Sequence, residues 1–101
     1  MAIKSFTHKG LEELYVNGDS PRINNQHHKV LLKYMDAINA SHHPKDLKAI
    51  YRHKFSIKKG SGDGVYSLEV NGNFRLTFQI EDYGAVFLDY QDYHGKQIRA
   101  K

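Results

Sequence analysis

The stretch VYSLEVNGNFRLTFQIE, residues 65–81, alternates apolar and polar side chains on both sides of an Asn-Gly-Asn turn. This alternation predicts two half-buried strands, and the turn residues predict that they form a hairpin. A second turn at DYG, residues 82–84, leads into AVFLDYQDYH, which predicts a last strand. Because the apolar face of the second strand must be buried, Arg75 is expected on the opposite face, open or only partly covered. Its guanidinium either pairs with Glu69 or Glu81 or is available to a ligand.

Helices are predicted before this hairpin. Residues 8–18 have leucines at helical spacing and end at Asn-Gly, which is typical of a short helix. Residues 23–41 carry a longer apolar stripe and predict a core-facing helix whose start Asn24 or Asn25 can cap. The members of this stripe are Leu31, Tyr34, Met35 and Ile38.

The remaining segments complete the predicted architecture. Residues 2–6 alternate and predict a short strand, whereas residues 42–64 predict a loop leading into a strand near residues 53–58. The expected fold class is therefore α+β: a short N-terminal strand, two helices, then a twisted antiparallel sheet of three to four strands, with the helices covering one face.

Length and composition indicate a single soluble domain. The chain has 101 residues, of which 40% are hydrophobic and 26% are charged. It has no run approaching the roughly 18 apolar residues of a membrane span, and its start lacks the apolar core of a secretory signal. There are no cysteines, which fits a reducing compartment. We therefore expect a cytoplasmic protein with no membrane partner.

The positive charge is concentrated in one window. The net charge is +4, yet residues 45–60 alone hold six cations and one acid, Asp46. Three further cations follow His94 in the tail. This polarisation favours a polyanionic partner, although a solvated basic loop explains the charge equally well. If the partner is RNA, the cations expected to contact its phosphates are Lys48, Arg52, Lys54, Lys58 and Lys59. If that RNA is also a substrate, Lys58 and Lys59, which precede the Gly-rich turn, are expected nearest the phosphate that is cut.

The run Asp92-Tyr93-His94 places three proton-handling side chains together. The pKa of His94 is near neutrality in its reference state, so its imidazole can act as acid or base. Asp92 is the alternative proton acceptor or an orienting group. Tyr93 can stack on a nucleobase if the ligand is RNA. A turn cap, a cover for the sheet edge and a frayed end are the ordinary structural explanations for the same residues.

A metal site is not expected, although the chain has seven histidines. The histidines at 27–28 and at 42–43 are adjacent pairs, whose side chains point apart on a helix or a strand. The chain has no HExxH motif and no cysteine, and its Gly-rich turn lacks the P-loop pattern. We therefore expect no metal and no cofactor.

Three stretches together resemble the HigB toxins, a branch of the RelE/ParE superfamily of bacterial toxin–antitoxin systems. They are the opening IKSFTHKGLEELYVNG, the middle block KKGSGDGVYSLEVNGNFRLTF and the closing DYQDYH. The likeness runs over nearly all of residues 3–94, so it implies one RelE-like domain over residues 1–94, followed by a basic tail at 95–101.

The resemblance implies a toxin that cuts messenger RNA in the A site of the 70S ribosome without a metal. It also implies a HigA-like antitoxin with a helix-turn-helix domain. The family's catalytic residues match Asn73, Arg75, Asp92, Tyr93 and His94, and Lys59 matches its lysine-glycine turn.

One departure and two alternatives stay open. Ser56 occupies the position where the family commonly has a histidine, and His53 lies three residues before it. Either His53 takes part through a shifted register, or the protein works without that imidazole. The alternatives are a weakly active degenerate relative and a non-catalytic, ParE-like toxin that poisons gyrase.

Overall fold

An antiparallel sheet of four strands, in the order β1-β2-β3-β4, forms one layer of the protein. The computed structural model describes residues 1–58 and 64–92. Within these ranges the strands are β1 (Phe55–Lys58), β2 (Val65–Asn71), β3 (Phe74–Glu81) and β4 (Gly84–Asp92). The helices are α1 (Lys9–Asn17), α2 (His28–Ala40) and α3 (Pro44–Tyr51), with 3₁₀ turns at Asn25–His27 and Arg52–Lys54. The predicted α+β class is confirmed.

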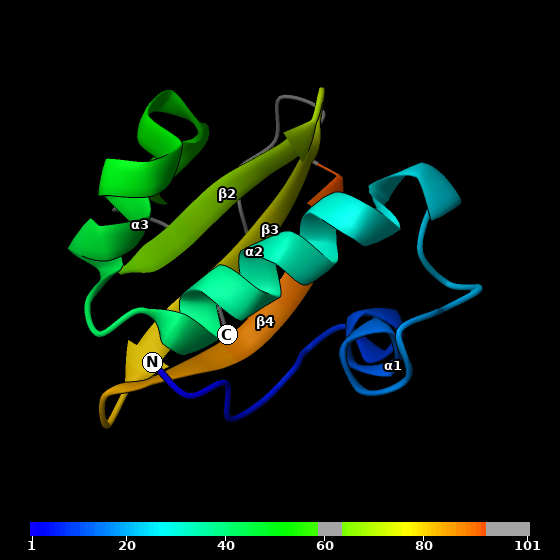
Figure 1. The fold of residues 1–101 in the computed structure, drawn as a ribbon, viewed down its shortest axis with the longest axis horizontal. Helices are drawn as coiled ribbons and strands as arrows, with labels where there is room; N and C mark the ends of the chain where they lie inside the picture. The colour runs from blue at the N-terminus through cyan, green and yellow to red at the C-terminus, as the bar shows by residue number, and fades with distance from the viewer. Residues whose placement is uncertain (59–63, 93–101) are drawn as a thin grey trace.

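The second layer is helical, and α2 crosses one face of the sheet (Figure 1). The predicted apolar stripe of this helix is buried, which confirms that it faces the core. Burying a large apolar side chain contributes about 1.5–3 kcal/mol, so this stripe is a main source of stability. Tyr34 of α2 also donates a hydrogen bond from its hydroxyl to the Glu69 carbonyl of β2 at 2.5 Å, which ties the helix to the sheet. No helix in the described ranges is long and apolar enough to cross a membrane.

The predicted loop over residues 42–52 is wrong, because α3 lies there. His43 caps this helix by accepting the Lys45 N–H, and Asp46 accepts the backbone N–H of His43 in return. Pro44 stands in the first turn, where its missing N–H costs nothing. Leu47 is fully buried and holds the short helix on the core.

The N-terminal segment is less regular than a strand. It meets β4 at two isolated parallel bridges, Ile3 with Ala85 and Phe6 with Leu88. The Lys4 N–H donates to the Ala85 carbonyl at 2.8 Å, so this segment covers the edge of β4. An edge covered in this way is protected from pairing with another chain.

Both predicted hairpin turns are confirmed, but the second uses unusual residues. Glu81 pairs with Gly84, which leaves a loop of two residues, Asp82 and Tyr83. Their φ angles are 51° and 64°, so both adopt the left-handed conformation of a type I′ turn. Tyr83 is 93% exposed, so no packing of its ring offsets the backbone cost.

We expect Tyr83→Gly to stabilise the protein. A left-handed non-glycine residue costs about 1–2 kcal/mol, and the extra chain entropy of glycine returns part of this, so the free energy of unfolding should rise by about 0.5–1 kcal/mol. Urea denaturation measures the change. Tyr83→Ala is the control, because it removes the ring but keeps the backbone cost. Equal stability of the two variants would contradict this explanation.

Candidate functional site

Arg75 lies near the start of β3, beside the turn that follows β2. Its Nη1 donates to the Gly72 carbonyl at 2.7 Å and to the Phe74 carbonyl at 3.1 Å. In the sheet, Arg75 stands between Glu69 of β2 and Gln91 of β4. One guanidinium nitrogen is thus anchored to the turn, which fixes the direction of the charge.

The sheet face around Arg75 was predicted to be open or only partly covered, and the row beside Arg75 is buried. Ser67, Thr77 and Gln91 are all buried, with exposed fractions of 0%, 2% and 6%. The Gln91 amide donates to the Thr77 hydroxyl at 2.9 Å, which satisfies this pair in a buried setting. Within the described ranges, the buried Ser67 hydroxyl has no hydrogen-bond partner. The row next to Arg75 is therefore polar and covered, and not simply solvated.

Asn73 and Asp92 lie at the same end of the sheet as Arg75. Asn73 stands in the turn between β2 and β3, and Asp92 is the last residue of β4, opposite Phe74. Because neighbouring residues of a strand point to opposite faces, Asp92 follows Tyr90 on the α2 side, whereas Arg75 lies on the other side. Folding thus brings these three predicted residues to one end, with Arg75 and Asp92 on opposite faces of it.

A contact between the buried His27 and the half-buried Tyr90, which precedes Asp92 by two residues in β4, was not predicted. His27, which is 4% exposed, contacts the Tyr90 hydroxyl through Nδ1 at 2.6 Å. Phe74 stacks on Tyr90 with ring centroids 5.0 Å apart, and its ring also meets that of His27. Desolvation raises the pKa of Tyr90, and the nearby charge of Asp92 raises it further, while a hydrogen bond with the Asn24 backbone opposes the shift. His27 continues the apolar stripe of α2 one turn upstream of Leu31, and this spacing could have shown that His27 is buried, though not which residue it contacts.

We expect Tyr90→Phe to destabilise the fold through His27. The substitution keeps the ring that stacks on Phe74 but leaves a buried imidazole nitrogen without its partner. An unsatisfied buried group of this kind costs about 1–3 kcal/mol of unfolding free energy, measurable by urea denaturation. Tyr83→Phe, at an exposed hydroxyl, should change nothing. A loss no larger than in that control would show that the contact contributes little.

The predicted RNA-binding cations are split between two ends of the sheet. Three of these cations are exposed: Lys48 on α3, and Arg52 and Lys54 in the 3₁₀ turn that follows it. This turn precedes Phe55, which pairs with Leu68 and so lies one row from Glu69 and Arg75. Lys58 pairs with Val65 at the other end of β1, farther from the Arg75 row than expected.

The structure places both His53 and Ser56, the residue at the position where the family commonly has a histidine. His53 belongs to the 3₁₀ turn that precedes β1 and not to a regular strand, so it has no strand register in which it could replace Ser56. Ser56 is half-buried and pairs with Ser67, on the sheet face that carries Arg75. Lys59, Tyr93, His94 and the tail at 95–101 lie outside the described residues.

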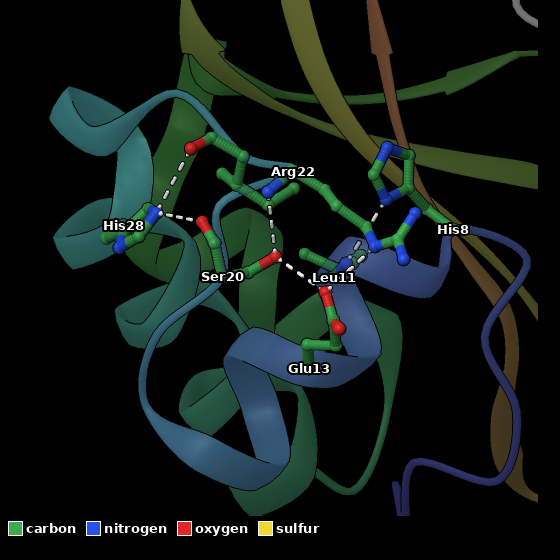
Figure 2. A network of polar contacts seen from close by, with 7 residues as sticks. His8, Leu11, Glu13, Ser20, Arg22 and His28 are labelled. Atoms are coloured by element: carbon green, nitrogen blue, oxygen red, sulfur yellow. Dashed lines mark hydrogen bonds and ion pairs between the residues drawn. The ribbon is translucent and has the colours of Figure 1, made fainter.

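Other histidines serve the fold. His8 accepts the Leu11 N–H at 3.1 Å and caps α1, as His43 caps α3. His28 donates from Nε2 to two backbone carbonyls, at 3.0 and 3.1 Å (Figure 2). The same close-up shows Ser20 bonded to Glu13, which also meets Arg22 at 3.2 Å. In the part of the chain that the structure describes, no three His, Asp or Glu side chains gather as metal ligands would.

Comparisons with known proteins match nearly the whole chain. A family model described as "RelE-like toxin of type II toxin-antitoxin system HigB" matches residues 4–94. Endoribonuclease HigB of Proteus vulgaris is 36% identical over 93 residues, which cover 91% of this chain and 99% of that relative. The matched region contains every strand and helix described above, together with Asn73 in the turn and Arg75 at the start of β3.

Proposed function

Because this chain belongs to the HigB-like family of RelE-like toxins from type II toxin–antitoxin systems, we propose that it arrests growth by cutting messenger RNA in the ribosomal A site. The chain is a type II toxin with endoribonuclease activity, like the relative from Proteus vulgaris that covers nearly all of it. The ribosome and the cytoplasm as its place of action are part of the proposal. So is a HigA-like helix-turn-helix antitoxin as its neutralising partner.

The proposed reaction needs few protein groups. The ribose 2′-oxygen attacks the adjacent phosphorus, the bond to the 5′-oxygen breaks, and a 2′,3′-cyclic phosphate and a 5′-hydroxyl result. A base must accept the 2′-OH proton, an acid must protonate the leaving oxygen, and a cation must balance the charge of the phosphorane. We assign the cation to Arg75, whose guanidinium stays charged and matches phosphate oxygens in a bidentate way.

The anchored guanidinium is the observation that best supports this proposal. The backbone carbonyls of Gly72 in the turn and of Phe74 in β3 hold Arg75 in place, so its charge needs little reorganisation when a phosphate arrives. We assign Asn73, in the turn before β3, to contact with the ribose or a nucleobase. We propose that His94 exchanges protons with the substrate and that Tyr93 stacks on a nucleobase of the RNA. We propose that Asp92 either accepts the 2′-OH proton as the general base or orients His94.

A translation assay tests the proposal. The purified chain should cut a messenger that is being translated, leaving 2′,3′-cyclic phosphate ends, and should spare the same RNA without ribosomes. Its antitoxin, added beforehand, should prevent cleavage. Intact messenger together with a DNA-damage response in cells would contradict the proposal and support gyrase poisoning instead.

A further inference from the structure

A cavity of about 530 Å³ opens between the start of α1 and the sheet face that carries Arg75. This volume is within the roughly 300–1,000 Å³ typical of ligand sites. Its floor includes Thr77 and Gln79 of β3, with Phe87 and Asp89 of β4. Arg75 is not part of it but precedes Thr77 by two residues on the same strand face, a step of about 7 Å. The cavity therefore continues the proposed active site along the sheet.

Phe87 lies in this floor in a costly backbone conformation. Its φ is 56°, which is rare for a bulky residue. The register shows why: Thr77 pairs with Asp89 but Gln79 pairs with Val86, so β4 has one extra residue opposite Phe78. Such a bulge redirects a side chain, and bulges are frequent beside active sites. The Phe87 N–H donates to the Ser5 hydroxyl at 2.9 Å, which holds the distortion and leaves the half-buried ring lining the cavity.

The opposite wall is basic. Lys9 and Arg22 line it together with His8, against the carboxylate of Asp89 on the floor, and the Nε of Arg22 is also paired with Glu13 at 3.2 Å. Figure 2 shows His8 and Arg22 close together at the start of α1. A β-carbon at Gly10 would lie 2.6 Å from the Arg22 β-carbon and 2.9 Å from a ring atom of His8, so only glycine lets this wall close as it does.

We propose that this cavity is a subsite for one nucleotide of the RNA strand, next to the nucleotide whose phosphate lies at Arg75. The base stacks on Phe87, Lys9 and Arg22 contact the phosphate, and Gln79 offers its amide to the base edge. An aromatic platform beside cations is the usual combination for binding single-stranded RNA. An acidic segment of a protein would use the cations but would not need the aromatic ring. This inference rests on the proposed function, because it takes RNA as the substrate.

The test uses an RNA hexanucleotide with 2′-O-methyl riboses, which binds but is not cut. Titrated into ¹⁵N-labelled protein, it should shift the amide signals of Lys9, Phe87 and Asp89. Phe87→Ser should weaken its binding about tenfold, the scale of one lost base stack, and Phe87→Tyr should restore it. The matched control is Tyr83→Ser, since Tyr83 is also an aromatic residue at positive φ in the β3–β4 hairpin but is exposed and outside the cavity. Lys9→Gln should weaken binding severalfold, with Lys33→Gln as its control.

Three results would overturn the subsite. Affinity of Phe87→Ser and Lys9→Gln equal to that of their controls would do so. The subsite would also be overturned if the amide shifts were confined to the turn before Arg75 and did not reach Phe87. If the wild-type protein still cut messenger in that case, the proposed function would remain intact. Loss of antitoxin binding in both variants with RNA binding unchanged would show that the cavity binds protein. Absence of cleavage by the wild-type protein would count against the proposed function, and the shifts at Phe87 would still decide whether the cavity binds RNA.

Discussion

Arg75→Gln should lower the rate of messenger cleavage by about 10²–10³-fold, the usual cost of removing one preorganised group that stabilises transition-state charge. The guanidinium lies at the end of the sheet, anchored by the carbonyls of Gly72 and Phe74. Glutamine keeps a polar side chain of moderate length but carries no charge. Single-turnover cleavage on translating ribosomes measures the change, and growth arrest on expression should disappear.

Arg75→Lys separates charge from geometry. Lysine keeps the charge but cannot form the paired contacts of a guanidinium, so its rate should fall between those of glutamine and arginine. Binding of the antitoxin and the unfolding midpoint serve as fold controls for both variants. Cleavage within about threefold of wild type in Arg75→Gln would remove this residue from the mechanism, because no loss of transition-state stabilisation would remain to explain.

The strands and α2 could be predicted because their periodicity is strong. The alternation over residues 65–81 and the apolar stripe of α2 both reflect which side chains face the core. The order of apolar and polar residues in the sequence shows this pattern directly. α3 was missed because its apolar side is narrow, with Leu47 as its fully buried side chain among cations. Its start signal was nevertheless present: Pro44 follows a capping histidine and Asp46 closes the capping box. Backbone hydrogen bonds from His42 and His43 hold the pKa of that carboxyl below its usual value.

The candidate site was predictable only in part, because register is not visible in a single strand. The sequence placed Asn73 and Arg75 beside a turn, but it did not show that Asp92 ends opposite Phe74. The bulge at Phe87 changes the pairing register of every later residue of β4 with β3. The alternation of apolar and polar residues over 84–92 does not predict this bulge. The contact of His27 with Tyr90 joins residues 63 positions apart, which periodicity cannot detect.

Replacing Lys48 and Lys54 together by glutamine should weaken binding to the 70S ribosome on the order of tenfold at physiological salt. Both side chains are exposed on the segment that leads into β1, near the row of Glu69 and Arg75. Contacts with phosphates release counterions, so each contact contributes about 0.7–0.9 to the slope of log affinity against log salt. The double variant should therefore reduce this slope by about 1.5, as measured by titrations at several salt concentrations.

The control with the same change in charge is Lys29→Gln with Lys33→Gln, on the exposed side of α2. If only net charge mattered, the two double variants would lose affinity equally, since long-range steering depends on the total charge. A direct contact predicts a different result: the slope changes for Lys48 and Lys54 and stays nearly constant for the α2 pair. Cleavage of bound messenger should remain close to wild type in both, because these lysines are assigned to binding and not to the charge balance or proton transfers of the reaction. Equal slopes for the two double variants would mean that the basic window acts as a solvated surface, and the ribosome contact would have to be sought elsewhere.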